Sequence, residues 1–586
     1  MDDPDNYRGI TLLSCLGKLF TAVIDSRLTA YLEKAGMLGD EQAGFRAGYS
    51  TIDHVFVLHC LIDLYLSQRK RLYCAFVDYK KAFDLVDRAS LWSKLISSNI
   101  NGKIMRVIYN LYDNAKSCVR VKNEKSELFN CNIGVRQGDN LSPLLFAIYL
   151  NDFEYFLSRS YKGLSLVADK IRVCLSNDDV EIYLRMFVLL YADDTIVMAE
   201  SPPELQKALN ALHSYCDLWH LTVNTSKTKV VVFSRGKIRN KPIFKFGDVE
   251  LDIVDDYVYL GVTFNYNGNF KKAISKQVSQ AKRAMFSVVA KVKKLNLPVD
   301  IACDLFDKLV VPVALYGSEV WGFENIMQIE VFYRKFLRHV LQVHKSTASC
   351  IVYGETGRYK LSKIVETKMI SFWCRILTGK QSKLSCMLYR LIKVLHDDVN
   401  SEFNSRWINK IISILDSCGF GNVWSEQEYL NTTWIKLALD LRLNDIYKQD
   451  WHNEVFENSQ CVNYRIFKEV HSFESYLVQL NERDRKDLCK FRCGSHHLPC
   501  VQGRYEGIPR HNRLCNLCNF GIIGDEFHYL FECDYFKESR DKYIPTQYIE
   551  HPNTLIMSNL FNTKDVKILS KLAKFVRIIM LKFSRS

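Results

Sequence analysis

The feature that most constrains this chain is a pair of adjacent aspartates, Asp193 and Asp194, between two short apolar runs at residues 187–191 and 195–198. Short runs rich in Val, Ile and Leu are typical of buried strands, so the aspartates are predicted at the tip of a hairpin. Neighbouring carboxylates repel each other, and at the edge of an apolar sheet they favour a hard divalent cation such as Mg²⁺. From this stretch alone, the alternative is a polar hairpin turn that binds nothing.

The charge balance of the chain favours a polyanionic partner. The 586 residues include 79 Lys and Arg against 65 Asp and Glu, which gives a net charge of +14. Hydrophobic residues make up 48% of the chain, so there is material for several packed cores. The length corresponds to roughly four domains of about 150 residues.

Cysteine usage and the N-terminal sequence favour a reducing compartment. The chain has 19 Cys, an odd number, and it begins with the polar, acidic sequence MDDPDNYRGI. We therefore expect reduced thiols and an intracellular location, in the nucleus or the cytoplasm, without a signal peptide. No apolar run reaches the roughly 18 residues of a membrane span, so no transmembrane segment and no membrane partner are expected.

A second carboxylate follows a second apolar strand. Residues 72–77 form an apolar run that ends at Asp78. A buried strand that delivers a carboxylate at its C-terminal end is a common way to place a catalytic acid. Further along, residues 134–139 form a loop bracketed by glycines.

The strongest helical pattern, at 271–294, combines an apolar stripe with an entirely cationic surface. Its cations are Lys271, Lys272, Lys276, Lys282, Arg283, Lys291, Lys293 and Lys294, and it contains no acid. A solvated surface helix is the alternative, but such helices usually mix charges of both signs. The pattern therefore favours contact with a phosphate backbone.

Four blocks in a fixed order carry a resemblance to a known family. They are FVDYKKAFD at 76–84, GVRQGDNLSP at 134–143, YADD at 191–194 and YLG at 259–261. Together they resemble the reverse transcriptases of non-LTR (LINE-type) retrotransposons. Residues 6–13 and 42–46 resemble the finger motifs of that family. The resemblance runs from residue 5 to about 340 and resumes near 485.

The resemblance implies an α+β fold shaped as a right hand of fingers, palm and thumb, followed by a helical region and a small CCHC zinc module. On this view, fingers and palm occupy 1–265, the thumb 266–345, a helical connector of unassigned role 346–480, and the zinc module with its terminal helix 481–586. Family members usually carry more finger sequence and often an upstream endonuclease. We therefore expect an N-terminally truncated member with incomplete fingers and no endonuclease domain.

The resemblance also implies an activity, that of an RNA-directed DNA polymerase. Such an enzyme extends a DNA primer on an RNA template with dNTPs, and it holds the RNA–DNA hybrid that forms. The reaction uses two Mg²⁺ (or Mn²⁺) ions ~3.5–4 Å apart. Asp78 and Asp193 would be their principal ligands, with Asp194 assisting. The alternative is a catalytically inactive, retroelement-derived nucleic-acid-binding protein.

Other roles follow from the same resemblance. Phe83 would lie beneath the incoming sugar and exclude a 2′-OH, although an ordinary core Phe is the alternative. Gln137 and Gly138 would line the nucleotide and template, and Arg46 would reach the triphosphate unless it is merely an exposed loop residue. Lys227 would protonate pyrophosphate. The primer grip would be Tyr259, Leu260 and Gly261.

Near the C-terminus, the spacing C-x2-C-x9-H-x4-C predicts a zinc site. Its ligands would be Cys515, Cys518, His528 and Cys533, because three thiolates and one imidazole satisfy tetrahedral Zn²⁺. Unrelated buried cysteines are one alternative. Nearby residues could supply other ligands, namely Cys489, Cys493, His496, His497 and Cys500.

We expect the zinc module to bind nucleic acid through the basic residues around it, Arg504, Arg510, His511 and Arg513. The terminal helix at about 564–583 is amphipathic. It is predicted to pack on the zinc module.

Overall fold

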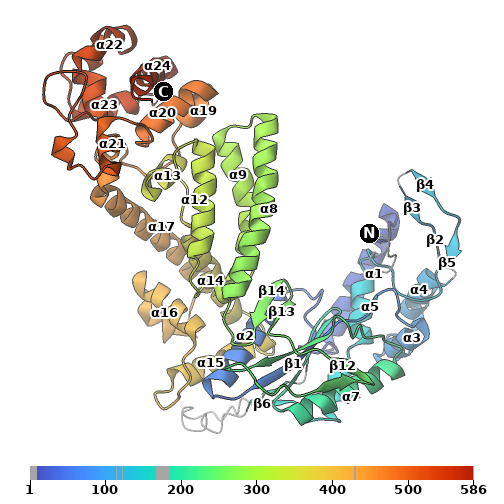
Figure 1. Cartoon of the computed structure of the whole chain (residues 1–586). Helices are drawn as coiled ribbons and strands as arrows, with labels where there is room; N and C mark the ends of the chain where they lie inside the picture. Colours follow the sequence, from blue (N-terminus) through green and yellow to red (C-terminus); the bar gives the residue numbers. More distant parts are fainter. Residues whose placement is uncertain are drawn as a thin grey trace. The chain divides into compact units, whose positions relative to one another are not determined.

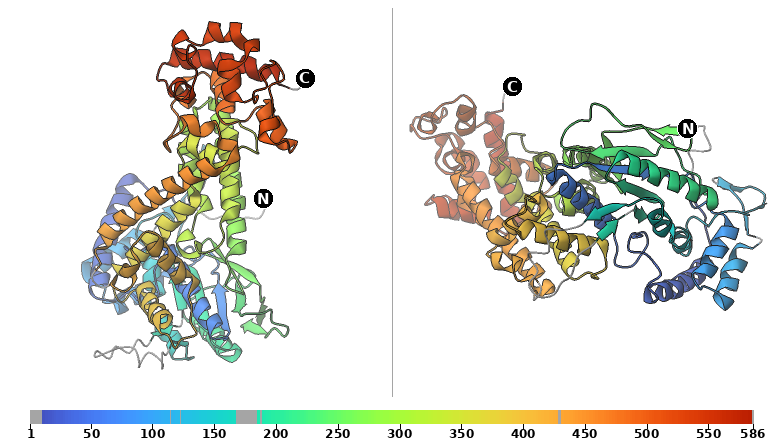
Figure 2. Two further views of the ribbon diagram at one scale, coloured as in Figure 1. Left: turned by 90° about the vertical axis from the view of Figure 1, so that its left-hand side faces the viewer. Right: turned by 90° about the horizontal axis from the view of Figure 1, so that it is seen from below.

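The computed structural model describes residues 10–113, 115–121, 123–166, 184–186, 188–427 and 430–584 (Figures 1 and 2). The chain divides into two compact units. The first comprises residues 1–273 and 375–410, and the second comprises residues 274–374 and 411–586. The mixture of helices and sheet agrees with the predicted α+β class.

The centre of the first unit is a four-stranded antiparallel sheet with the strand order β10-β1-β9-β8. The strands are β1 (Leu72–Val77), β8 (Val188–Tyr191), β9 (Asp194–Ala199) and β10 (Lys229–Phe233). Both apolar runs beside the aspartates are therefore strands, as predicted. The strands β1 and β9 are buried along almost their whole length, because helices cover both faces of the sheet.

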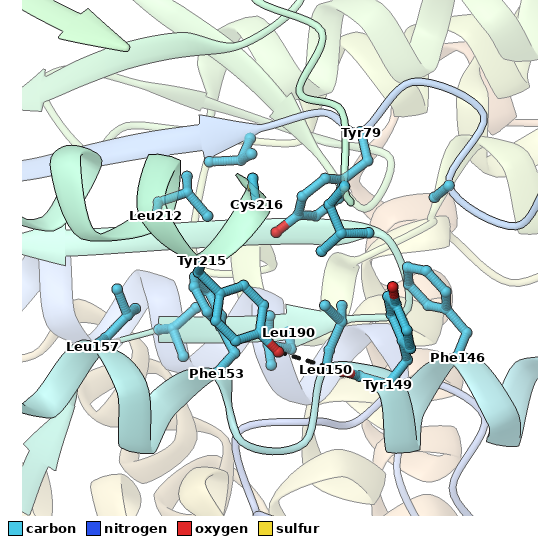
Figure 3. Packing of buried hydrophobic residues seen from close by; sticks show 14 of the residues in the cluster. Tyr79, Phe146, Tyr149, Leu150, Phe153, Leu157, Leu190, Leu212, Tyr215 and Cys216 are labelled. Atoms are coloured by element: carbon cyan, nitrogen blue, oxygen red, sulfur yellow. Dashed lines mark hydrogen bonds between the residues drawn. The ribbon is translucent and has the colours of Figure 1, made fainter. Parts of the chain in front are cut away.

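Alternate residues of β1 face different layers. Tyr73, Ala75 and Val77 join a core with the helices α3 (Arg88–Ser97), α5 (Ser142–Tyr149), α6 (Phe153–Ser158) and α7 (Pro202–Leu218). In Figure 3, Tyr215 of α7 reaches between the helices, and its hydroxyl donates to the main-chain oxygen of Tyr149, 3.3 Å away. On the other face, α2 (Thr51–Ser67) packs against β1 and β8. This two-sided packing fixes the ends of the strands, where the carboxylates lie.

The remaining elements of the first unit are peripheral to this sheet. The other helices are α1 (Cys15–Lys34), α4 (Gly102–Tyr112) and α15 (Leu384–Asp397). Small two-stranded sheets complete its described part: β2 (Lys116–Ser117) with β5 (Phe129–Asn130), β3 (Arg120–Val121) with β4 (Glu124–Lys125), β6 (Leu164–Leu166) with β7 (Leu184–Met186), β11 (Phe244–Phe246) with β12 (Val249–Leu251), and β13 (Asp256–Tyr259) with β14 (Val262–Asn265).

Residues 375–410 differ from the predicted domain boundaries. We placed them in a helical connector at 346–480, but they fold into the first unit, where α15 packs on α2. A buried ion pair fastens this contact: Lys383 Nζ lies 2.9 Å from the carboxylate of Asp53, which is 2% exposed. Arg375 adds a second cation, 3.4 Å from the same carboxylate. A buried charge of this kind is stable only with its partner in place, so the two segments depend on each other.

The second unit is helical. Its helices are α8 (Lys271–Leu295, whose first three residues belong to the first unit), α9 (Val299–Leu309), α10 (Val311–Ala314), α11 (Ser318–Trp321), α12 (Met327–Leu341), α13 (Ser349–Thr356), α14 (Leu361–Leu377), α16 (Arg406–Ser417), α17 (Thr432–Glu457), α18 (Tyr464–Phe467), α19 (Tyr476–Gln479), α20 (Glu482–Arg492), α21 (Pro499–Tyr505), α22 (Lys537–Tyr543), α23 (Thr554–Phe561) and α24 (Val566–Lys582). The chain passes between the units within α8, within α14 and within α16. A π-helical turn, η7, covers His528–Glu532.

The predicted basic helix is confirmed as α8. Its apolar stripe is buried at Ile274, Val278, Ala281 and Val288, and all eight of its cations are exposed. Within the described ranges, every helix is too short or too polar to cross a membrane.

A buried arginine lies among several helices of the C-terminal region, which Figure 2 draws in orange and red. Arg492 is fully buried, and its guanidinium lies 3.0 Å from Glu355 and 2.9 Å from Glu474. The rings of Phe467 and Phe561 pack against it. The Arg492 guanidinium thus contacts two carboxylates and aromatic rings, and these contacts join α13, α18, α20 and α23.

Candidate active site

The two adjacent aspartates lie at a tight hairpin turn. Tyr191 of β8 pairs with Asp194 of β9, which leaves only Ala192 and Asp193 in the turn. Ala192 has φ 56°, in the left-handed region that few residues other than glycine adopt. The turn thus presents Asp193 partly buried and Asp194 exposed, as predicted for a hairpin tip.

The third carboxylate reaches the same place from β1. Val77, the last residue of β1, pairs with Thr195, so the next positions, Asp78 and Asp194, lie at the same end of the two neighbouring strands. The main chain of Asp78 is fixed on both sides. Its N–H donates to Thr228 Oγ1 at 3.1 Å, and its carbonyl accepts from the N–H of Asn224 at 2.7 Å.

The three carboxylates lie near two tyrosines, Tyr257 and Tyr79, and contribute to the raised pKa of each phenol. Burial and then the negative charges of Asp194 and Asp78 raise the pKa of Tyr257 to about 12. Burial also raises the pKa of Tyr79, and the charge of Asp193 adds to that shift. Tyr257 thus lies near a carboxylate from each of the two strands.

A residue to which the sequence analysis gave no role supports the turn. Gln42 is buried, and its side-chain oxygen accepts from the N–H of Ala192 at 3.2 Å and from that of Gly44 at 3.0 Å. The flanking main chain runs along β8: the N–H of Leu190 donates to Glu41 O, and Leu190 O accepts from Ala43. A Cβ added to Gly44 would lie 2.4 Å from the nitrogen of Ala192, so glycine permits this approach.

Phe83 lies on the segment that follows β1, five residues after Asp78. Its ring is partly buried and stacks on Phe146, with the ring centroids 4.8 Å apart. Its carbonyl accepts from the N–H of Val135 at 2.8 Å, which joins this segment to the loop at 134–139. A Cβ on Gly134 would meet the carbonyl of Asp84 at 2.4 Å, so this glycine permits the contact.

The same loop brings Gln137 and Gly138 to the residues of the first finger-like motif. Gln137 O accepts from the N–H of Thr11 at 2.8 Å, and the Oε1 of Gln137 is buried without a protein partner. Gly138 has φ 104°. Residues 6–9 of that motif lie outside the described residues.

The hairpin of β13 and β14 carries Tyr259, Leu260 and Gly261. Tyr259 pairs with Val262, so Leu260 and Gly261 form a two-residue turn, with φ 46° and 80°. The Tyr259 hydroxyl lies 3.3 Å from Nδ1 of the buried His54. Tyr257 stacks on Phe76 of β1, with the ring centroids 4.4 Å apart. The hairpin is thus anchored beside β1. Tyr257 and Tyr259 alternate along β13, and this spacing in the sequence indicates that both rings lie on one face of the strand.

Arg46 and Lys227 occupy contrasting environments. Arg46 is buried, not on an exposed loop surface, and its Nε donates to Glu33 at 2.9 Å while its Nη1 donates to Gln42 O at 3.1 Å. This guanidinium supports the segment that carries Gln42. Lys227 is exposed in the turn that holds the main chain of Asp78.

Three carboxylates at the open end of a sheet suit a hard divalent cation. Carboxylate oxygens are the ligands that Mg²⁺ and Mn²⁺ prefer, and Asp78 and the Asp193-Asp194 turn bring three carboxylates to one end of the sheet. The donor set therefore fits the ions that the sequence predicted.

Comparison with known families identifies a domain in the first unit. Residues 2–264 match the family described as reverse transcriptase (RNA-dependent DNA polymerase). The chain contains a reverse transcriptase domain. The match spans Asp78, the loop at 134–139, both turn aspartates and the YLG hairpin, so the resemblance found in the sequence is confirmed.

Relatives of the reverse transcriptase domain come from mobile elements. The chain is 28% identical over 347 residues to the probable RNA-directed DNA polymerase from transposon BS of Drosophila melanogaster, which covers 58% of this chain and 36% of that protein. It is 26% identical to the RNA-directed DNA polymerase from mobile element jockey of Drosophila funebris, with the same coverage. It is 27% identical to the Pol polyprotein of the type-1 retrotransposable element R2 of Popillia japonica, over 54% of this chain and 42% of that one.

The chain thus spans less than half the length of these relatives. Among solved structures, telomerase from Candida tropicalis is similar over 64% of this chain and 57% of that one, with 15% identity and a TM-score of 0.32.

Outside the reverse transcriptase domain, the structure assembles the predicted Cys/His cluster. The ligand atoms of Cys515, Cys518, His528 and Cys533 all lie within 4.8 Å of one another. The sulfurs of Cys515 and Cys533 are 4.0 Å apart, and Cys518 Sγ is 3.4 Å from His528 Nε2. These spacings suit the edges of a tetrahedron around one metal ion.

Second-layer contacts orient the ligands of this cluster. Glu532 lies 3.1 Å from the other ring nitrogen of His528, so the imidazole presents Nε2 to the thiols. The buried Arg540 donates to the carbonyls of Phe531 and Cys533. Ring contacts join Phe575 and Phe583, at the C-terminal helix, to Phe536 and Tyr529, so the predicted packing of this helix is confirmed.

Cysteines and histidines at 489–500, the alternative zinc ligands, are not part of the CCHC cluster. Cys489 and Cys493 face each other, 3.9 Å apart, while His496 and Cys500 contact Glu526. Among the described residues, the group of potential ligands that forms around one point is the CCHC set.

Two of the four basic residues expected to bind nucleic acid around the cluster, Arg510 and Arg513, also have partners inside the protein. Arg510 pairs with Asp525 at 2.9 Å, and Arg513 donates to the carbonyls of Ile508 and Cys500. The expectation that Arg504, Arg510, His511 and Arg513 bind nucleic acid stays a prediction, although two of the four also have partners inside the module. The charges and donors of these two hold the loops of the module together, which sequence spacing could not reveal.

Proposed function

We propose that this chain is an RNA-directed DNA polymerase of a non-LTR retroelement that extends a DNA primer on an RNA template with dNTPs. The observation that carries the proposal is the arrival of Asp78 and the Asp193-Asp194 turn at one end of the same sheet. Two divalent ions bound there would lower the pKa of the primer 3′-OH and neutralise charge on the leaving pyrophosphate.

In this proposal, each residue has a defined task. Asp78 and Asp193 supply the principal carboxylate oxygens from two different strands, so their spacing is set by the sheet rather than by a flexible loop. Asp194 is exposed beside them and assists.

The surrounding residues position the nucleotide. Phe83, held flat against Phe146, closes the space that a ribose 2′-OH would need. Gln137, with its buried and unpaired Oε1, and Gly138 line the nucleotide and template side. The Leu260-Gly261 turn, anchored through Tyr259, holds the primer end. The exposed Lys227, in the turn that holds the main chain of Asp78, would protonate the leaving pyrophosphate. We do not assign Arg46 to the triphosphate, because its donors are used by Glu33 and Gln42.

We also propose how the parts of a polymerase are distributed along this chain. Fingers and palm correspond to the first unit up to about residue 265, and the thumb begins with the cationic helix α8. The exposed cations of α8 suit the phosphate backbone of an RNA–DNA hybrid. The CCHC set would hold Zn²⁺ as a structural ion, because four protein ligands leave no open position.

A second candidate function is nucleic-acid binding without synthesis, as in a catalytically inactive derivative of a retroelement. The exposed cations of α8 favour it, because they need no catalytic metal to bind a backbone.

Primer extension distinguishes the two functions. The assay uses the full chain, an RNA template, a DNA primer, dNTPs and Mg²⁺ or Mn²⁺. We expect extension by the wild type and less than about 1% of that rate in Asp193→Ala. The control is Asp248→Ala, which removes an exposed carboxylate in the β11–β12 turn and should extend normally. Binding of the primer–template without extension would support the second function, and full activity in Asp193→Ala would refute the first.

A further inference from the structure

The second unit contains a groove that the catalytic proposal does not use. A hollow of about 440 Å³ lies along the C-terminal half of α12 and is lined by Arg334, Lys335, Arg338, His339 and Lys345 with two valines. A hollow of about 310 Å³ adjoins it and shares Val343. The second hollow lies between residues 342–346 and parts of 490–505. We call the two together the α12 groove.

The charge of the α12 groove is strongly positive. Among the described residues, no Asp or Glu lines either hollow, and Lys490 adds a further cation. The guanidinium of Arg338 donates to the carbonyl of Thr347 at 2.8 Å, and that of Arg334 donates to Ser349 Oγ at 3.0 Å. These acceptors are neutral, so they orient the two guanidiniums without cancelling their charge. Burial and the neighbouring Arg334 lower the pKa of Arg338, as expected for cations crowded together.

An exposed aromatic ring stands at the far end of the groove. Tyr505, the last residue of α21, is 58% exposed. Its hydroxyl is hydrogen-bonded to Ser346, whose own hydroxyl lies 2.6 Å from His344 Nδ1. The N–H of His344 donates to Ser495 Oγ at 2.8 Å, which ties the two walls of the groove together. The ring is therefore held in place although much of it faces solvent.

Cations along a groove with a fixed, exposed aromatic ring match one class of ligand. A single strand of nucleic acid offers phosphates at regular intervals and unpaired bases that can stack on a ring. A duplex offers phosphates, but its bases are stacked on one another. An acidic peptide offers carboxylates but no ring of comparable size at each residue.

We propose that the α12 groove binds single-stranded nucleic acid, with phosphates on Lys335, Lys345 and Lys490 and a base on Tyr505. The site shares no residue with the carboxylates at the end of the sheet or with the CCHC cluster, and its occupancy needs neither catalysis nor a catalytic metal. It also differs from the duplex backbone contact proposed for α8.

The test measures binding of fluorescent oligouridylate and oligothymidylate of about 20 nucleotides to the full chain at several salt concentrations. The groove variant carries Lys335→Glu, Lys345→Glu and Lys490→Glu, and in the structure none of these lysines pairs with a carboxylate among the described residues. The matched control carries Lys448→Glu, Lys571→Glu and Lys574→Glu, which change the net charge equally at exposed positions outside the groove. We expect the groove variant to bind at least about 30-fold more weakly than the control, with a shallower dependence on salt.

A second variant tests the aromatic ring. Tyr505→Leu should weaken single-strand binding by about tenfold without changing the salt dependence, and Tyr505→Phe should restore most of the loss. Ultraviolet crosslinking followed by peptide mapping should place crosslinks in 334–345 and 490–505. Asp193→Ala should bind as the wild type does, so failure of primer extension and failure of this site can be told apart.

Three results would overturn the proposal. The groove variant and its control could bind equally, or all crosslinks could map outside the two segments. A blunt duplex, or polyglutamate at equal charge, could compete as well as the single strand while Tyr505→Leu changes nothing. The last result would reduce the α12 groove to a general anion surface.

Discussion

The side-chain oxygen of Gln42 lies 3.2 Å from the main-chain nitrogen of Ala192, although the two residues are 150 positions apart in the chain. Ala192 adopts a left-handed conformation in the turn that carries Asp193. A non-glycine residue keeps such a conformation only when its surroundings fix it, and the hydrogen bond from Ala192 to Gln42 supplies one such restraint. Gln42 therefore acts on the carboxylate through the geometry of the turn.

We predict that Gln42→Met lowers the rate of primer extension by about ten- to a hundredfold. Methionine has a similar volume but cannot accept from the N–H groups of Ala192 and Gly44, so the turn loses its restraint. The effect should appear mainly in kcat, because no contact with the nucleotide is removed. The measurement is single-turnover extension at saturating dNTP.

The control for this prediction is Gln68→Met, at an exposed glutamine after α2. It should leave the rate unchanged. Wild-type rates in a folded Gln42→Met protein would show that the turn holds its shape without this bond.

Phe83→Val should increase the use of ribonucleotides. The ring of Phe83 stacks on Phe146. In Phe83→Val, the smaller side chain therefore leaves open space beneath the sugar of the incoming nucleotide. We expect the preference for dTTP over UTP, measured as the ratio of kcat/KM values, to fall by at least about tenfold.

Phe156→Leu is the control for the sugar selection, because Phe156 is also partly buried and packs against Tyr215. It should lower stability without altering the ratio. Unchanged discrimination in Phe83→Val would make Phe83 an ordinary packing residue.

The residues that could be predicted from sequence are those whose role follows from their local pattern. Asp78 ends an apolar strand, and Asp193 and Asp194 separate two such strands, so their positions follow from strand formation alone. The CCHC spacing is also local, and the four ligand atoms meet as predicted.

What the sequence could not supply depends on distant partners. The buried position of Arg46 depends on Glu33, and the role of Gln42 depends on Ala192. Residues 375–410 show no local sign of joining the first unit, because the decisive contact is the ion pair of Lys383 with Asp53. Such pairings become visible only when the chain is folded.

Loss of one cluster ligand should remove zinc from the C-terminal module. We expect about one zinc ion per wild-type chain and close to none in Cys515→Ser, since a structural site needs all four ligands. Thermal unfolding should begin at a lower temperature, because a bound ion would hold η7 and the loop at 513–524 through the four ligands. Elemental analysis and calorimetry measure the two effects.

Cys500→Ser makes the matched comparison, because Cys500 is buried nearby but contacts Glu526 instead of the cluster. It should retain zinc. The reverse pattern, with zinc lost in Cys500→Ser and kept in Cys515→Ser, would assign the metal to the other group of ligands.

The segment beside β8 contains a carboxyl pair that should make stability fall at alkaline pH. Burial and the neighbouring Glu41 raise the pKa of Glu154 to about 8. The main-chain oxygen of Glu41 accepts from Leu190 of β8, so the pair lies against the strand that leads to the catalytic turn. The ordinary glutamate pKa is about 4.3, so between that value and 8 the folded chain keeps a proton that the unfolded chain has lost.

This difference fixes the sign of the effect. The stabilising contribution of protonated Glu154 is complete below about pH 4.3, declines as the pH rises and is gone above about pH 8. We predict that Glu154→Gln, which stays neutral, raises the free energy of unfolding at about pH 8.5 by on the order of 2 kcal/mol relative to wild type, with little difference at about pH 4.5. Urea denaturation at the two pH values measures this, with Glu250→Gln on the exposed strand β12 as the control. A gain that is equal at both pH values would show that Glu154 does not retain a proton in the folded protein.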